Sequence, residues 1–136
     1  MTHRRLLMVT SMAVAAFAVT WGARNLDAQA PGFKRVELQR HDIGSTGREA
    51  VMTRAEFQPG AETPKHTHPG EEVGFVLEGE LSIQFEDKPA TRLKAGESFF
   101  VAAGQVHQGK NTAKRTTIVL STYIVERGKP LATTVK

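Results

Sequence analysis

The chain has 136 residues, a formal net charge of +4 at pH 7 and no cysteine. This length is below the size at which proteins commonly divide into several domains, so one domain is expected. The modest charge argues against a nucleic-acid partner, and the lack of cysteine excludes disulfide bonds, thiol catalysis and thiolate metal ligands.

Residues 1–30 have the organisation of a cleavable signal peptide. A basic start with Arg4 and Arg5 precedes an apolar stretch over residues 6–21, and an A-x-A cleavage site ends at Ala30. The apolar stretch is shorter than the roughly 20 residues that a membrane span needs, so no stable span is expected after cleavage. The alternative is an uncleaved N-terminal anchor. The arginine pair fits a twin-arginine signal and a general secretory signal equally well, and either predicts a periplasmic or secreted protein.

From residue 31 onward the pattern is that of short strands separated by turns. Residues 51–57 alternate apolar and polar side chains, and residues 116–125 form a long β-branched strand. The turn Glu78-Gly79-Glu80 predicts a hairpin between strands at 73–77 and 81–85. Further strands are expected at 36–38 and 98–101. Because no convincing helix follows residue 30, an all-β sandwich or barrel is predicted.

Three histidines and one glutamate have the spacing of a metal site. His66 and His68 are two residues apart and therefore share one face of a strand. A turn over residues 69–71 can bring Glu72 back towards them, and His107 would arrive from a distant strand. The alternative, ordinary surface histidines, is weaker, because three of the four histidines after residue 30 fall at these spacings. Such a mixed nitrogen and oxygen donor set suits a divalent first-row metal.

The glycines around these residues complete two motifs. The first is Gly60, His66, His68, Glu72, Gly79, and the second is Gly96, Ala102, Gly104, His107, Asn111. In order and spacing the chain resembles the small bacterial cupins, of the type-2, quercetinase-like kind, over about residues 36–125. That family has a proline where this chain has Ala102, which removes a turn stiffener but no ligand. The resemblance implies a cupin double-stranded β-helix, or jelly-roll barrel, as a single domain over residues 31–136.

The resemblance also implies the roles of the site residues. His66, His68, Glu72 and His107 would be four ligands of one divalent transition metal ion per chain, with two cis positions open to water, substrate or O₂. Open positions favour chemistry, since structural metal sites are usually closed. Glu72 is also the candidate base. Iron or manganese is favoured, because a chain folded before twin-arginine export could load either in the cytoplasm; zinc, nickel and copper are the alternatives.

Three functions fit this site. The first is an exported, metal-dependent, dioxygenase-like enzyme that acts on a small organic substrate in the barrel pocket. The second is a non-redox metalloenzyme, an isomerase, lyase or decarboxylase, that uses the metal as a Lewis acid. The third is a non-catalytic cupin that binds a small ligand. Fold alone cannot decide among them.

The pocket wall and the oligomeric state give further expectations. A homodimer is expected, paired through a sheet edge with the strand at 116–125 as the candidate. Arg54 and Gln105 are the polar candidates for substrate recognition, although surface exposure explains them equally well. Of the neighbours Phe99 and Phe100, only one should face the metal. The apolar candidates for the wall are Phe57, Phe75, Val76, Phe99, Phe100 and Tyr123.

Overall fold

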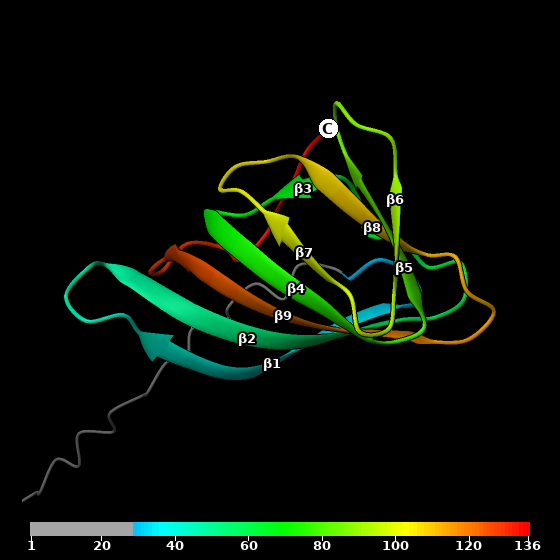
Figure 1. Ribbon diagram of the computed structural model, residues 1–136. Coiled ribbons are helices and arrows are strands. Elements are labelled where there is room, and N and C mark those ends of the chain that lie inside the picture. Colours follow the sequence, from blue (N-terminus) through cyan, green and yellow to red (C-terminus); the bar gives the residue numbers. More distant parts are fainter. Residues whose placement is uncertain (1–28) are drawn as a thin grey trace, which may run out of the picture.

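The computed structural model describes residues 29–136, in which the chain forms ten strands and no helix (Figure 1). The predicted signal peptide, residues 1–30, lies outside the described residues except for its last two. Within residues 29–136 there is no helix with the length and apolar character that crossing a bilayer requires. The strands are β1 (Phe33–Asp42), β2 (Arg48–Phe57), β3 (His66–Thr67), β4 (Gly70–Glu78), β5 (Glu80–Phe85), β6 (Thr91–Lys94), β7 (Ser98–Val101), β8 (His107–Asn111), β9 (Thr117–Glu126) and β10 (Thr133–Thr134).

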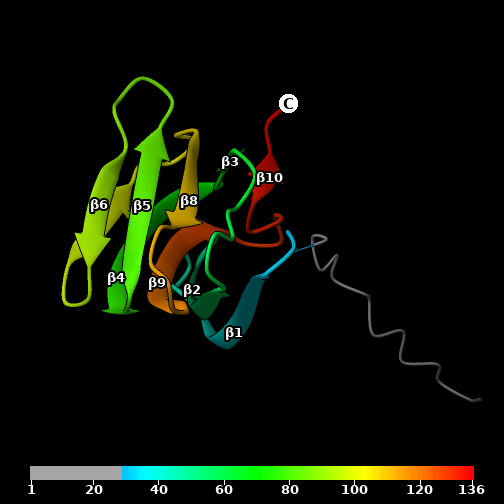
Figure 2. The same cartoon turned by 90° about the vertical axis from the view of Figure 1, so that its right-hand side faces the viewer.

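The strands form two antiparallel five-stranded sheets with the core between them (Figure 2). Sheet A has the order β1-β2-β9-β4-β7, and sheet B has the order β10-β3-β8-β5-β6. The predicted all-β architecture is therefore confirmed. Sheet A contains three of the longest strands side by side, whereas the strands of sheet B are short.

The strands predicted from alternation are present in sheet A. In β2 every second side chain, from Glu49 to Phe57, is buried, and the residues between them are half-buried. The same alternation runs through β9. A half-buried strand places successive side chains on opposite faces, so one face of each strand supplies the core and the other faces outward.

β9 lies in the middle of sheet A, where it pairs with β2 on one side and β4 on the other. The expectation that a second copy pairs with an edge of this strand is therefore wrong, because both of its edges already make hydrogen bonds. The edge strands are β1 and β7 in sheet A and β10 and β6 in sheet B.

The predicted hairpin around Gly79 is also wrong. β4 pairs with β7 and β9 in sheet A, whereas β5 pairs with β6 and β8 in sheet B. Gly79 has a φ of 80°, and a Cβ there would lie 2.5 Å from the hydroxyl of Thr117. That hydroxyl accepts a hydrogen bond from the N–H of Glu80 and donates one to its carbonyl. Gly79 therefore marks the point where the chain crosses from one sheet to the other.

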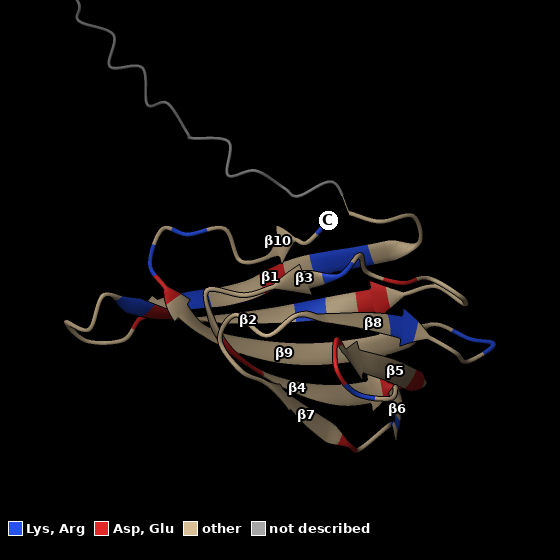
Figure 3. Ribbon diagram, turned by 90° about the horizontal axis from the view of Figure 1, so that it is seen from above, with Lys and Arg blue, Asp and Glu red and all other residues tan. Residues whose placement is uncertain are grey.

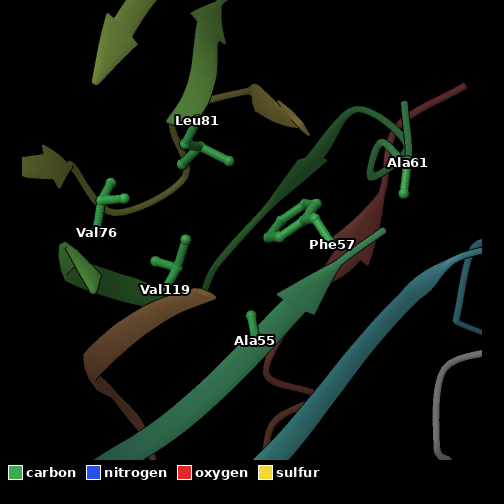
Figure 4. Close-up of a cluster of buried hydrophobic side chains, with 6 residues drawn as sticks. All are labelled: Ala55, Phe57, Ala61, Val76, Leu81 and Val119. Atoms are coloured by element: carbon green, nitrogen blue, oxygen red, sulfur yellow. The ribbon is translucent and has the colours of Figure 1, made fainter. Parts of the chain in front are cut away.

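Two apolar clusters fill the space between the sheets. The larger contains six buried residues, five on strands and one on a loop (Figure 4), namely Ala55, Phe57, Ala61, Val76, Leu81 and Val119. The smaller contains Val51, Tyr123 and Val125, and Leu131 from the C-terminal segment packs against it. Members of both clusters line the cavity described below.

Candidate metal centre

The two sheets bring the four predicted site residues together. His66 on β3 and His107 on β8 are paired in register in sheet B. Glu72 lies on β4 in sheet A, between Val101 and Tyr123 of the neighbouring strands. His68 stands on the short connection from β3 to β4. All four side chains are buried, with exposed fractions between 2% and 8%.

The ring nitrogens of the three histidines converge on one point. One nitrogen from each ring lies within 4.8 Å of the others, a spacing that could hold a metal ion. Glu72 lies beside this set, with its Oε2 at 3.1 Å from Nε2 of His68 and 3.5 Å from Nε2 of His107. The carboxylate therefore approaches the ring nitrogens that would face the ion.

The other nitrogen of each histidine is fixed by the main chain. In every case Nδ1 lies within hydrogen-bond distance of a backbone carbonyl oxygen, which can only accept, so Nδ1 carries the hydrogen and Nε2 keeps its lone pair. Metal-binding histidines commonly have their second nitrogen oriented in this way. In the order His66, His68, His107, the acceptors are the carbonyls of Pro64 at 2.8 Å, Leu131 at 2.6 Å and Gln105 at 3.0 Å.

The surroundings of His68 Nε2 indicate whether these residues suit a metal ion. It is buried and has no hydrogen-bond partner among the residues that the structure describes. The oxygen of Glu72 lies 3.1 Å away, but an ionised carboxylate and a nitrogen that keeps its lone pair are both acceptors, so neither can donate to the other. A buried polar atom without a partner is costly, and a cation at the centre of the cluster would supply that partner. The donor set therefore fits a divalent metal ion.

The protonation states suit the same purpose. Burial, and to a smaller extent the neighbouring His107, lower the pKa of His66 to about 4, so the ring is neutral near pH 7. Burial raises the pKa of Glu72, whereas the neighbouring His107 and His68 lower it, and the net result is a pKa well below its ordinary value. A neutral imidazole and an ionised carboxylate are the forms that bind a metal.

Tyr123 borders the site without carrying charge. Its ring meets the His68 ring edge-on, with the centroids 4.7 Å apart. Burial raises the pKa of Tyr123, the Glu72 carboxylate raises it further, and the positive charge of Arg35 lowers it. The phenol therefore keeps its proton at neutral pH.

His66, Glu72 and His107 open onto a cavity between the sheets. The cavity has a volume of about 40 Å³, which is room for about three waters or an organic molecule of a few heavy atoms. Its apolar wall includes Phe57, Phe99, Leu81, Ile83 and Val119, and its polar wall includes Arg35, Thr63, Ser121 and Tyr123.

The predicted wall is partly right. Phe57, Phe99 and Tyr123 line the cavity, and Val76 is buried in the larger apolar cluster. Phe99 faces inward and Phe100 outward, as expected of neighbours on a strand. The placement of Phe75 and Phe100 in the wall is wrong, because both are exposed on the outer face of sheet A.

The polar candidates for substrate recognition lie elsewhere. Arg54 forms an ion pair with Glu56, and neither residue lines the cavity. The side-chain oxygen of Gln105 accepts the N–H of Ala102 at 3.1 Å, and the N–H of Gln105 donates to the carbonyl of Ala102 at 3.1 Å. Because proline has no N–H, this side chain closes the turn in a way that the family's proline could not. Gln105 also supplies the carbonyl that orients His107.

Arg35 is a charged wall residue that the sequence analysis did not predict. It lies two residues after Phe33 on β1, and both residues line the cavity. The expected first strand, 36–38, began too late to include either residue, and no alternation of apolar and polar residues marks the start of β1, because Lys34 and Arg35 are both charged.

Comparison with known proteins agrees with this fold. Residues 53–123 match the family model for the cupin domain. Germin-like protein subfamily 2 member 2 of Arabidopsis thaliana is 42% identical over 77 residues, which are 53% of this chain and 35% of that protein. The chain thus spans about a third of the length of this curated relative.

Solved structures show the same architecture. Oxalate oxidase in complex with the substrate analogue glycolate superposes with a TM-score of 0.64 and 24% identity, over 79% of this chain and 57% of that one. The DMSP lyase DddQ from Ruegeria pomeroyi DSS-3 gives a TM-score of 0.63 and 24% identity, over 76% of this chain and 51% of that one. At this identity the likeness establishes the fold, and the predicted jelly-roll architecture is confirmed. Since the family model covers more than half of its residues, the protein belongs to the cupin family.

Proposed function

We propose that the protein is a metal-dependent cupin enzyme with dioxygenase-like activity on a small organic substrate. One observation carries the proposal: three buried imidazoles have Nδ1 fixed by backbone carbonyls, so that three Nε2 atoms face a shared point beside a cavity. In this proposal the ligands are His66, His68, His107 and Glu72. A bound iron or manganese ion would supply redox and Lewis-acid chemistry.

The chain's own residues would prepare that chemistry in distinct ways. The three carbonyl acceptors hold the imidazoles in the ligand tautomer. Glu72, whose pKa is lowered, serves better as an anionic ligand than as a base, because a general base works best when its pKa is near the working pH. Phe57 and Phe99 in the cavity wall exclude water around the reacting groups.

The second candidate is non-redox chemistry on the same metal site. It is favoured by the similarity of the fold to both an oxidase and a lyase, with TM-scores of 0.64 and 0.63. Substrate turnover that continues without O₂, in protein loaded with zinc or nickel, would favour this candidate. Substrate-dependent O₂ uptake by iron- or manganese-loaded protein would favour the first.

Elemental analysis of purified variants tests the ligand assignment. We expect about one metal ion per chain in the natural protein and strong loss in His66→Ala and Glu72→Ala. His41→Ala is the matched control, because His41 is exposed on β1 and should leave the metal content unchanged. Equal metal content in all four proteins would overturn the assignment.

We also propose that the protein is exported, on the basis of the signal-like residues 1–30. The processed chain would begin at Pro31 and reside in the periplasm or outside the cell. N-terminal sequencing of protein recovered from the periplasm or medium tests this. A chain that retains residue 1 in the cytoplasmic fraction would contradict it.

The outer face of sheet A supports a homodimer that differs from the edge-paired one. Val73, Phe75 and Leu77 on β4 and Phe100 on β7 are 41% to 57% exposed, and Val73 lies opposite Phe100 in register. Figure 3 shows that β7 and most of β9 carry no charged residue, whereas β1 and β2 carry several. A contiguous exposed apolar patch is typical of an interface, and a second copy would cover it symmetrically. Light scattering that shows Phe100→Glu with the same mass as the natural protein would contradict this contact.

A further inference from the structure

Arg35 places a positive charge in the wall of the cavity. On β1 it is paired in register with Ala55, and Phe33 is paired with Phe57. Cross-strand partners project from the same face of a sheet, and Ala55 and Phe57 are buried on the inner face of sheet A. Arg35 therefore projects inward. Of the residues from 29 to 136 that line this cavity, it is the one lysine or arginine.

The guanidinium of Arg35 has no carboxylate partner in the described part of the chain. Most of the other arginines there do form ion pairs, and Arg54 and Arg48 pair with Glu56 and Glu71. The backbone of Arg35, in contrast, is held in sheet A by the pairing of β1 with β2. A fixed main chain thus carries a half-buried cation that has no carboxylate partner among residues 29–136.

Arg35 also stands between two cavities. A second cavity of similar size lies beside the first, and the two share Phe33, Arg35, Thr63 and His66 as lining residues. A molecule in either cavity can therefore reach the guanidinium. The planar guanidinium offers two parallel N–H donors that match the two oxygens of a carboxylate.

The other charged group in the first cavity is Glu72, which on its own repels an anion. An anionic ligand therefore needs a nearby positive charge that Glu72 does not neutralise, and no ion pair joins Arg35 to Glu72 within residues 29–136. The small volume limits the ligand to a few heavy atoms.

We propose that Arg35 is a specificity-determining residue that binds the carboxylate of a small organic acid in the cavity it shares with His66, Glu72 and His107. The inference rests on the proposed function, because it names the substrate class of the same site. Arg35 is a binding residue in this proposal and takes no part in proton transfer.

Anion binding can be measured without turnover. Acetate and its uncharged counterpart acetamide are titrated into the ¹⁵N-labelled full chain, both metal-free and loaded with redox-inert Zn²⁺, and binding is followed by NMR chemical shifts. We expect acetate to bind and acetamide not to bind. Arg35→Gln should weaken acetate binding about tenfold or more, because a charge-assisted pair of hydrogen bonds is lost. Arg35→Lys should keep part of the affinity, since it keeps the charge without the fork.

Arg54→Gln is the matched control, because it removes an arginine from the outer face of the same sheet. It should bind acetate like the natural protein. Circular dichroism and metal content are measured on every sample. Equal acetate affinity in folded Arg35→Gln and natural protein would overturn the inference while leaving the metal site intact. Arg35-dependent binding in protein that takes up no metal would support the anion site and overturn the proposed function.

Discussion

Removing residues 131–136, which include β10, is expected to weaken metal binding while the strands β1 to β9 stay folded. His66 and His107 each donate Nδ1–H to a carbonyl two residues earlier in the chain. His68 instead donates to the carbonyl of Leu131, 63 residues away, at 2.6 Å. The truncation therefore removes the orienting acceptor of one histidine and leaves the acceptors of the other two in place.

The size of the effect follows from these contacts. Loss of a hydrogen-bond partner behind a metal-binding histidine typically weakens metal affinity about 10- to 100-fold, or about 1.4 to 2.7 kcal/mol. β10 also pairs with β3, where Thr134 lies opposite His66, so the upper part of this range is expected. The half-buried Leu131 side chain contributes about 1 kcal/mol of folding stability through its contact with the smaller apolar cluster, which is too little for its loss to unfold the chain.

A competitive Zn²⁺ titration against a chromophoric chelator measures the affinity, and circular dichroism checks the fold. Leu131→Ala is the control, because it trims the side chain but keeps the carbonyl that His68 uses; its affinity should stay within a few-fold of the natural protein. A folded, truncated chain with unchanged Zn²⁺ affinity would refute the reasoning. So would a Leu131→Ala variant that loses as much affinity as the truncation.

Three further outcomes are expected. Asn111→Asp should lower the free energy of unfolding by about 2–4 kcal/mol. The buried Asn111 amide donates to two backbone carbonyls at 2.8 and 2.9 Å, which a carboxylate would repel. An unchanged midpoint of urea denaturation would contradict this. For metal-free protein, the free energy of unfolding should fall by about 3 kcal/mol as the pH drops from 6.5 to 4. His66 in the folded state has a pKa of about 4 against the ordinary 6.5, so only the unfolded chain binds its proton in that window; His66→Gln should flatten the profile. Gly74→Ala should weaken acetate binding, because its Cβ would lie 2.0 Å from the tip of the Phe99 ring and push that ring out of its place in the cavity wall. NMR titration that shows natural affinity would contradict this.

Local patterns in the sequence predicted the strands but not their partners. The alternation from residue 51 to 57 reports burial on one face of β2, which is a property of neighbouring residues. The turn at Gly79 has the same residue types whether the chain folds back on itself or crosses to the other sheet. In the folded chain the crossing is held by Thr117, whose hydroxyl binds both backbone groups of Glu80 from 37 residues away. No local pattern carries that information.

The same distinction applies to the site. The His66 and His68 spacing and the later His107 were readable because the residue types themselves are informative. Arg35 could not be identified from the sequence, since an arginine on a strand is ordinary and only the register with Ala55 shows that it projects inward. The role of Leu131 was equally hidden, because the interaction uses its carbonyl rather than its side chain, and every residue type has a carbonyl.

The position of the histidines and Glu72 on opposite sheets has a consequence for the stability of the fold. His66 and His107 belong to sheet B and Glu72 to sheet A, so a metal ion bound by all three would act as a cross-link between the layers. The chain has no cysteine and hence no disulfide to do this. Each tenfold excess of free metal over the dissociation constant would add about 1.4 kcal/mol to the free energy of unfolding. The concentration of free metal around the protein would then contribute directly to its stability against unfolding.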